Sequence, residues 1–186
     1  MDLGIDGRRA AVAAGTSGLG LGAATSLAAE GARVVVCGRD EGRLRAAGER
    51  SGHDAQGVVC DVGSAAGGAE FVSLAEDALG GPLDILIPNA GGPPPGNFAS
   101  TDVAAYADAL ERNLLSIVGM CDAAVPGMQE RGFGRVVAIT SLSVRQPMAN
   151  IILSNTARAG ATAFHKTLAT EVARDGVTVN TVQPGT

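Results

Sequence analysis

The stretch that decides the fold is Ala13-Ala14-Gly15-Thr16-Ser17-Gly18-Leu19-Gly20-Leu21-Gly22, which lies between an apolar run and an Ala-rich helical segment, residues 23–30. A glycine-rich turn between a strand and a helix lets the backbone approach a ligand closely. The free N–H groups at the start of the helix attract a negatively charged phosphate. The stretch therefore predicts a turn that binds the pyrophosphate of a dinucleotide. The alternative is that some of its glycines, Gly22 in particular, serve only to pack the helix against the strand.

The rest of the chain alternates apolar, β-branched runs with Ala/Leu-rich spacers. These runs predict six strands, at residues 9–14, 32–37, 55–60, 83–88, 135–140 and 177–183. The runs are almost continuously apolar, which is typical of parallel strands covered on both faces by helices. We therefore predict an α/β fold with a doubly wound parallel sheet in three layers. Residues 1–186 show no linker, charge block or repeat, which predicts a single dinucleotide-binding domain.

Composition narrows the class of ligand. The 186 residues include 27 Gly and are 46% apolar, and the net charge is −5. That charge is of the wrong sign for a nucleic-acid binder or a polybasic membrane anchor, so we expect a small-molecule ligand. Residues 10–29 carry no charge but consist mostly of Ala and Gly, too weakly apolar for a membrane span.

The cysteines and histidines predict neither a disulfide framework nor a metal site. Cys37, Cys60 and Cys121 are odd in number and widely spaced, and His53 and His165 lie far apart in the sequence. We expect three reduced cysteines in the core of a cytoplasmic protein, and no metal.

The turn spaces its glycines as G-x-x-G-x-G, and this spacing resembles the T-G-x-x-x-G-x-G turn of short-chain dehydrogenases/reductases. Ala13 and Ala14 stand where that pattern has Thr and Gly, and Gly15 is expected to compensate one position later. The resemblance assigns cofactor binding in this turn to Gly15, Thr16, Ser17, Gly18, Leu19 and Gly20.

Further landmarks of the same family follow in order and extend the resemblance over practically the whole chain. Asp61-Val62 resembles the pair that contacts adenine, and Asn89-Ala90-Gly91 resembles the motif that braces the sheet beside the cofactor. Asn113 matches the structural and catalytic asparagine, and Ser141 matches the catalytic serine. Pro184-Gly185 matches the turn that closes over the nicotinamide. The resemblance is closest to 3-oxoacyl-acyl carrier protein reductases, and since those relatives continue beyond this turn, we expect the chain to be C-terminally truncated relative to the family.

The end of the second strand favours NADP(H) as the cofactor. NAD-preferring relatives carry an acid where Gly38 stands, because a carboxylate accepts hydrogen bonds from the ribose 2′-OH and repels a 2′-phosphate. Arg39 is placed to pair with that phosphate. NAD(H) stays possible, since Asp40 could turn in and Arg39 could be only a solvated residue at the start of a helix.

The active site departs from the family pattern. Ser154 and Arg158 stand where the family has the Tyr and Lys of Y-x-x-x-K, and the one tyrosine, Tyr106, is expected to pack at the start of a helix. Positions four apart share a helix face, so Ser154 and Arg158 still point together. A serine hydroxyl is a far weaker acid than a phenol of pKa about 10. Arg158 stays charged and can stabilise a developing alkoxide or clamp the cofactor's ribose or phosphate.

Two hypotheses follow. In the first, the protein is an NADP(H)-dependent oxidoreductase acting on a small carbonyl or alcohol. Ser141 and Ser154 orient the carbonyl, Arg158 stabilises the alkoxide, and water or the substrate supplies the proton. In the second, it is a catalytically inactive dinucleotide-binding pseudoenzyme with a regulatory or scaffold role. Ser154 could equally be a helix-surface residue.

Four further polar residues and two long helices also carry expectations. Ser143 and Arg145 could line the substrate mouth or simply be solvated, and His165 and Lys166 are expected at exposed or interface positions. The helices predicted at residues 103–128 and 151–174 are Ala-rich with few charges on one side. Such helices pack against another subunit, which, with the family resemblance, predicts a homodimer or homotetramer.

Overall fold

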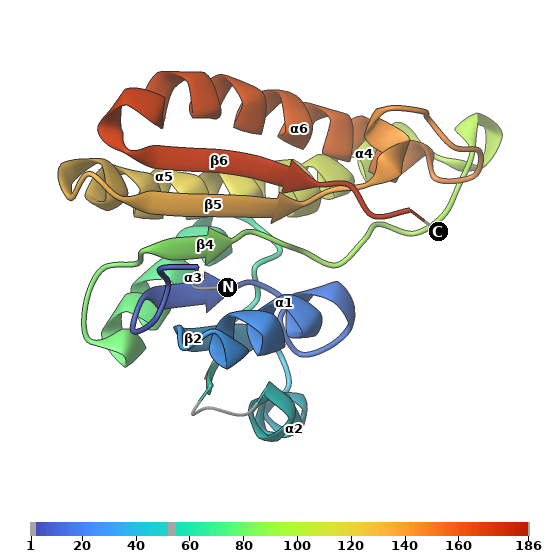
Figure 1. Cartoon of the computed structure of the whole chain (residues 1–186). Helices are drawn as coiled ribbons and strands as arrows, with labels where there is room; N and C mark the ends of the chain where they lie inside the picture. The colour runs from blue at the N-terminus through green and yellow to red at the C-terminus, as the bar shows by residue number, and fades with distance from the viewer. Residues whose placement is uncertain (1–2, 52–54, 186) are drawn as a thin grey trace.

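The sheet confirms the predicted doubly wound architecture. The computed structural model describes residues 3–51 and 55–185. They form three layers, with helices on both faces of a sheet whose order is β3-β2-β1-β4-β5-β6 (Figure 1). All strand pairs are parallel. From β1 the chain adds strands toward one edge, and it then returns to place β4 on the other side of β1. The order in which strands are added therefore reverses between β1 and β4, while the strands stay parallel.

The elements follow the predicted pattern with small shifts at their ends. The strands are β1 Arg9–Val12, β2 Arg33–Gly38, β3 Gln56–Val59, β4 Ile85–Ile87, β5 Gly134–Ile139 and β6 Val177–Val182. The α-helices are α1 Gly18–Ala29, α2 Glu41–Ser51, α3 Ala65–Leu79, α4 Val103–Leu110, α5 Ser116–Glu130 and α6 Ile152–Val172. Four of the six predicted strands are one to three residues too long, because apolar residues such as Ala13, Ala55 and Leu83 flank the paired residues.

The core lies on both faces of the sheet because successive strand residues point in opposite directions. On one face Ala11, Val35 and Leu86 pack beneath α3, α5 and α6. On the other face Ala10 and Val34 pack beneath α1 and α2. The apolar runs in the sequence therefore correspond to strands buried on both sides.

Helices α3 and α5 approach each other so closely that glycines are required between them. A Cβ on Gly119 of α5 would overlap the carbonyl oxygen of Ala65, and a Cβ on Gly68 of α3 would overlap that of Ser116. Backbone thus packs against backbone at this crossing, and any side chain would force the helices apart.

The prediction of a single α-helix at residues 103–128 is wrong. A π-helical turn, Glu111–Leu115, separates α4 from α5. Its one extra residue per turn rotates the buried face and turns Asn113 inward, to 2% exposure. A hydrophobic period cannot reveal one inserted residue, which is why the sequence did not predict the break.

The expected exposed position of His165 is also wrong. The ring is buried at 1% exposure on α6, with Nδ1 2.7 Å from the carbonyl oxygen of Ala161 and Phe164 packed edge-on against it. Burial lowers the pKa of His165, so the ring is a neutral core side chain near pH 7. Lys166 is exposed, as predicted.

The three cysteines are buried and free of disulfides, as predicted. Burial raises the pKa of Cys37 and of Cys121 to about 12, so both are neutral thiols near pH 7. Across residues 3–51 and 55–185, no helix has the length and apolarity needed to cross a bilayer. Within the same residues no group of His, Cys, Asp and Glu side chains is arranged to hold a metal ion.

Candidate functional site: a cleft at the carboxyl ends of the strands

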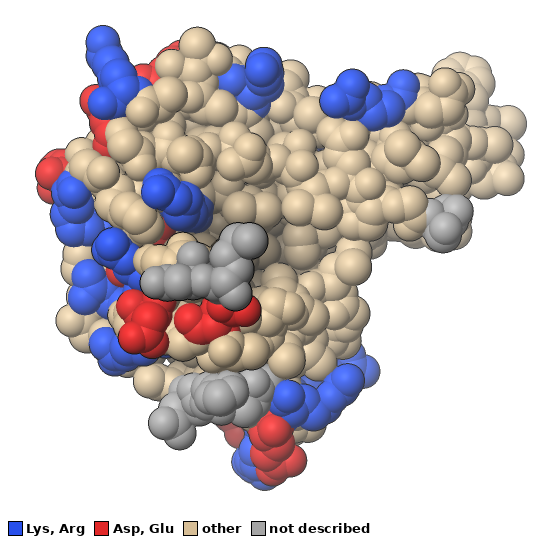
Figure 2. Space-filling model, in the orientation of Figure 1, with Lys and Arg blue, Asp and Glu red and all other residues tan. Residues whose placement is uncertain are grey.

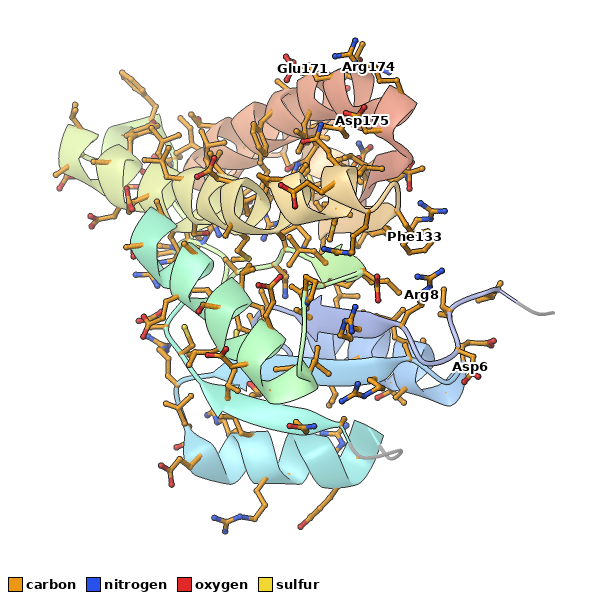
Figure 3. The ribbon with its side chains drawn as sticks, turned by 90° about the vertical axis from the view of Figure 1, so that its left-hand side faces the viewer. Asp6, Arg8, Phe133, Glu171, Arg174 and Asp175 are labelled. Atoms are coloured by element: carbon orange, nitrogen blue, oxygen red, sulfur yellow. The ribbon has the colours of Figure 1, made fainter. Side chains whose placement is uncertain are left out.

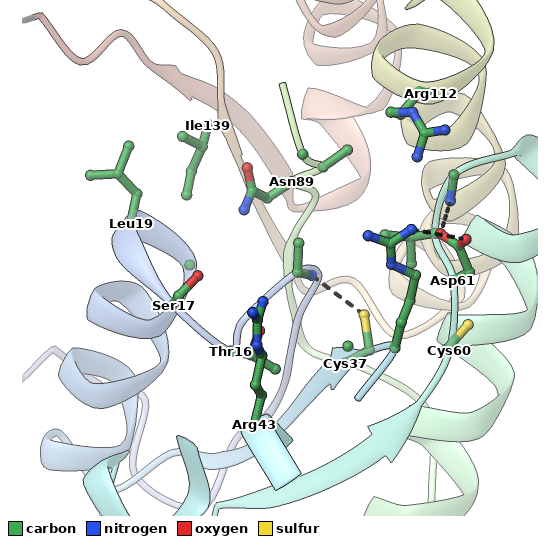
Figure 4. A pocket seen from close by; sticks show the side chains of 18 of the residues that line it. Thr16, Ser17, Leu19, Cys37, Arg43, Cys60, Asp61, Asn89, Arg112 and Ile139 are labelled. Atoms are coloured by element: carbon green, nitrogen blue, oxygen red, sulfur yellow. Dashed lines mark hydrogen bonds and ion pairs between the residues drawn. The ribbon is translucent and has the colours of Figure 1, made fainter. Parts of the chain in front are cut away.

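The carboxyl ends of the first five strands surround a cleft of about 550 Å³ (Figure 4). In open α/β sheets, ligands bind at this edge, next to the point where the strand order reverses. The segments after β1, β2, β3, β4 and β5 all contribute to the wall, together with Arg112 and Arg158 from the helical layer. Four arginines and two aspartates line the cleft, which favours an anionic ligand.

The glycine-rich turn forms one wall of the cleft. Thr16, Ser17, Leu19 and Gly20 line it, and α1 begins directly behind them. Ser17 is the N-cap of α1, but its side chain makes no capping hydrogen bond. Its hydroxyl lines the cleft and is available to a ligand. Gly18 has φ +55° and makes the turn, without being a lining residue.

Gly15 does not line the cleft, and a Cβ there would lie 2.8 Å from Cβ of Val36, so this glycine is needed for packing on β2. Its role in cofactor binding stays a prediction. The left-handed conformation falls one residue earlier, on Ala14, with φ +48°. The alanine therefore occupies a backbone conformation that favours glycine.

Replacing Ala14 with glycine is expected to stabilise the protein. A non-glycine residue in the left-handed region destabilises the folded state by about 1–2 kcal/mol. Glycine relieves this cost, but its greater freedom in the unfolded chain lowers the free energy of unfolding by about 0.4–1 kcal/mol. The net gain of about 0.5–1 kcal/mol corresponds to about 1–4 °C in melting temperature for a chain of this size, measured by thermal unfolding.

Gly15→Ala is the matched control for this prediction, because it adds a methyl group against Val36 in the same turn. It should lower the melting temperature. An Ala14→Gly variant that melts below the wild type would contradict the assignment of backbone strain to Ala14.

Two asparagines tie the cleft wall to its neighbours. Asn89 Nδ2 donates to the carbonyl oxygen of Ala13 (3.3 Å), which joins the ends of β4 and β1. Asn113 Nδ2 donates to the carbonyl oxygen of Gly91 (2.8 Å), which holds the segment after β4 against the π-helical turn. Ala90 and Gly91 line the cleft, whereas Asn113 lies behind them.

The Pro-rich segment after Gly91 is fixed at its far end as well. Gly96 N–H donates to Asn150 O (2.8 Å), and Ile152 N–H donates to Gly96 O (3.1 Å). Gly96 and Ile151 thus form an isolated parallel bridge at the start of α6.

The ends of β2 and β3 form the most charged part of the cleft. Arg39 Nη1 lies 3.8 Å from Asp61 Oδ2, and both side chains are more than half exposed (73% and 58%). Asp61 Oδ1 also accepts a hydrogen bond from Gly63 N–H, and Val62 is buried beside it. Asp40 Oδ1 accepts from Arg43 N–H (2.7 Å) at the start of α2.

Two arginines of this region were not predicted. Arg43 lines the cleft four residues after Arg39, and that spacing at the start of a helix was the signal that could have identified it. Arg112 lines it from the π-helical turn, and no sequence pattern indicated that a residue so far along the chain would reach this point.

Arg158 is the predicted catalytic residue that reaches the cleft. Its Nη1 donates to the carbonyl oxygens of Ile139 (2.9 Å) and Thr140 (3.1 Å) at the end of β5. Burial lowers the pKa of the guanidinium from its ordinary value. The side chain is therefore a positioned, partly desolvated cation.

The other residues predicted for catalysis and for the closing turn lie outside the lining. Ser141 Oγ accepts from Ser143 N–H (3.1 Å) and caps a short helix, and Ser143 itself is buried rather than placed at a substrate mouth. Ser154 is half-buried on α6, one turn before Arg158. Pro184 O accepts from Leu142 N–H (3.0 Å), so the segment that contains Pro184 and Gly185 runs beside this short helix.

Comparison with known proteins agrees with this architecture. The family model for short chain dehydrogenases matches residues 8–186, and the chain belongs to the short-chain dehydrogenase family. It is 31% identical to the 3-oxoacyl-[acyl-carrier-protein] reductase of Vibrio cholerae over 181 residues, which are 97% of this chain and 74% of that protein.

Two solved structures carry information about ligands. L-sorbose reductase from Gluconobacter frateurii, complexed with NADPH and L-sorbose, matches with a TM-score of 0.91 and 32% identity, over 100% of this chain and 72% of its own. The NADPH-bound short chain oxidoreductase of Pseudomonas aeruginosa PAO1, which contains an atypical catalytic center, matches with a TM-score of 0.85 and 33% identity. That match covers 94% of this chain and 69% of the other. The chain therefore spans between 69% and 74% of the length of these three proteins.

Proposed function

We propose that the protein is an NADP(H)-dependent oxidoreductase that interconverts a small carbonyl compound and its alcohol through an atypical active site. The observation that carries the proposal is the cleft itself, in which a phosphate-binding turn and an arginine-rich end lie on either side of the strand ends. The cofactor would supply or accept the hydride. The residues of this chain bind it, orient the substrate and stabilise charge.

The glycine-rich turn supports binding of a dinucleotide. A Cβ on Gly20 would lie 2.6 Å from the carbonyl oxygen of Ala14, so only glycine lets α1 begin this close to the turn. The N–H groups at the start of α1 would then be available to a pyrophosphate. Thr16 and Ser17 add hydroxyl groups to the same wall.

The end of β2 favours the 2′-phosphate of NADP(H). Gly38 carries no carboxylate, and a Cβ there would lie 2.5 Å from Cγ2 of Thr16, so any side chain at this position would require Thr16 to move. Asp40 is engaged in capping α2. Arg39 and Arg43 are the charged groups beside the site, and guanidinium groups bind phosphate in a bidentate manner.

Arg39→Gln tests the cofactor assignment. Loss of one charge-assisted hydrogen bond, worth about 1.5–3 kcal/mol, is expected to raise the Kd for NADPH at least about 10-fold. The Kd for NADH should stay nearly unchanged, because NADH lacks the 2′-phosphate. Both constants can be measured by titration with nicotinamide fluorescence.

Arg174→Gln is the matched control, since Arg174 is 88% exposed and lies outside the cleft. An equal loss of affinity for NADPH and NADH in Arg39→Gln would contradict a contact with the 2′-phosphate. A wild-type protein that binds neither dinucleotide would overturn the proposed function altogether.

At the reacting end, Arg158 is proposed to stabilise the negative charge that develops on the substrate oxygen. A positioned cation in a partly desolvated site acts more strongly on such charge than one in water. Ser141 and Ser154 are proposed to orient the carbonyl, and water or the substrate provides the proton. Hydride transfer between aligned partners needs chiefly proximity and a polarised carbonyl.

A second candidate function is supported by the hydrogen bonds of Arg158. Its Nη1 is already held by two backbone carbonyls, and neither Ser141 nor Ser154 lines the cleft. These facts favour a dinucleotide-binding protein without catalysis, with a regulatory or scaffold role.

We further propose a cytoplasmic location and a homodimer or homotetramer. Free buried cysteines suit a reducing compartment. Val103 on α4 is 86% exposed and Leu115, directly before α5, is 42% exposed, so these helices present apolar side chains to a partner.

A further inference from the structure

The edge at which the strands begin, opposite the cofactor cleft, carries a second hollow of about 480 Å³. Arg8, Arg9 and Arg131 line it together with Asp84 and Phe133. Figure 2 shows Lys and Arg side chains on the left of the molecule, where the strands begin, and Figure 3 shows Arg8 close to Phe133 on that edge. A basic hollow is unexpected in a chain with a net charge of −5.

An aromatic ring fixes two of the cations at this edge. The Cζ atom of Arg8 lies 3.9 Å from the ring centroid of Phe133, and that of Arg135 lies 4.2 Å from it. Phe133 thus contacts both guanidinium groups. Cation–π contacts of this kind hold both groups in place without neutralising them.

Two carboxylates line the hollow, and Glu76 lies nearby, where its Oε1 accepts from Leu83 N–H. Asp84 is the buried one: its Oδ2 accepts from the backbone N–H of Arg9 (3.0 Å) and lies 3.9 Å from Arg9 Nε. Arg8 Nη1 lies 3.6 Å from Asp84 Oδ1, too far for a hydrogen bond, so the guanidinium can turn to another anion. The second carboxylate, Asp6, is exposed at the rim.

The hydrogen bonds of Arg131 and Arg135 go to backbone acceptors. Arg131 Nη2 donates to Leu83 O, and Arg135 Nη1 donates to Gly134 O and Gly176 O. In the described part of the chain neither has a carboxylate within ion-pairing distance. Three arginines and two carboxylates therefore line the hollow, and Arg135 adds a fourth positive charge beside Phe133.

We propose that this edge cluster, Arg8, Arg9, Arg131 and Arg135 around Phe133, binds the phosphate group of a small soluble ligand. A phosphate dianion supplies the missing negative charge and matches the planar fork of a guanidinium. The side chains of Arg8 and Arg9 are only 40% and 28% exposed, so solvent screens their charge less than that of a free surface arginine. The proposal does not depend on the activity proposed for the cofactor cleft.

Thermal unfolding with inorganic phosphate tests the site. Against sodium chloride of equal ionic strength, phosphate at about ten times its Kd is expected to raise the melting temperature of the wild type by about 3 °C. Arg8→Gln should lose at least half of this shift, relative to its own melting temperature without phosphate. Arg39→Gln, which alters the cofactor cleft, should keep it.

Two outcomes would overturn the proposal: no shift in the wild type beyond that of sodium chloride, or a shift that Arg39→Gln loses and Arg8→Gln keeps. The second outcome would place the phosphate in the cofactor cleft. If Arg8→Gln does not fold, the arginine Nε–Hε resonances of the wild type give the same answer. Phosphate should shift the signals of Arg8 and Arg131, and movement confined to Arg39 and Arg43 would contradict the site.

Discussion

Replacement of Arg158 by methionine is expected to lower kcat for NADPH-dependent reduction of a small ketone by about 10²- to 10³-fold, the loss typical of removing one group that stabilises an oxyanion. Methionine keeps much of the apolar length of the side chain and removes the charge. In the structure the guanidinium is held at the end of β5 and lines the cleft, and among the described residues Arg158 is the cation that donates to these two carbonyls. The decrease of nicotinamide absorbance at saturating NADPH measures the effect.

The same substitution removes two hydrogen bonds to backbone carbonyls, so cofactor affinity and melting temperature must be measured alongside. An unchanged kcat in a folded variant that still binds NADPH would contradict the role of Arg158. A drop in affinity with kcat unchanged would mean that Arg158 clamps the cofactor instead.

The double variant Ser154→Tyr, Arg158→Lys separates the two candidate functions. It places the family's proton donor and its partner on the same helix face. If the wild type is an enzyme that uses Ser154 and Arg158 in place of the family's Tyr and Lys, the change should reduce an existing activity. If the wild type binds a dinucleotide without catalysis, turnover should appear, since a positioned general acid raises the rate about 10²- to 10⁴-fold.

Gly119→Ala is expected to destabilise the fold by at least about 3 kcal/mol, at the upper end of the cost of overpacking. The new methyl group would overlap the carbonyl oxygen of Ala65, a backbone atom in the first turn of α3 that cannot turn away as a side chain can. For a chain of this size the change corresponds to a melting temperature lower by about 6–12 °C. Thermal unfolding followed by circular dichroism measures it.

Gly22→Ala is the control, because it makes the same chemical change in α1 with nothing within 4 Å of the new Cβ. It should raise stability by about 0.5–1 kcal/mol, the ordinary difference between the two residues in a helix. Equal effects of the two substitutions would show that helix propensity, rather than the contact between α3 and α5, determines the outcome.

The sequence was sufficient for the fold because its signals were redundant. Six apolar runs, their spacing and the turn at residues 13–22 all indicate the same sheet, and the strand order confirms it. The predicted ends of the strands were less accurate, because an apolar residue such as Ala13 is equally compatible with a strand and with the turn that follows it. The π-helical turn at Asn113 adds one residue to a helix without changing its composition.

The cofactor end of the cleft was partly predictable and the reacting end was not. Arg39 and Asp61 follow strands directly, so their position at the strand ends could be anticipated. Arg112 reaches the cleft from a distant helix through tertiary packing alone. The positive φ angle at Ala14 was not predicted, because the sequence shows which residue is a glycine, whereas only the structure shows which φ angle is positive.

The two anchors of the Pro-rich segment have a consequence for engineering. Asn113 holds it at Gly91, and the bridge to Ile151 holds it at Gly96, while its three prolines keep the intervening backbone stiff. Residues 92–95 thus form a short segment with fixed ends, so substitutions of their side chains should leave Gly91 and Gly96 in place. Such substitutions should leave Asn113 and Gly96 untouched, because these residues hold the two ends.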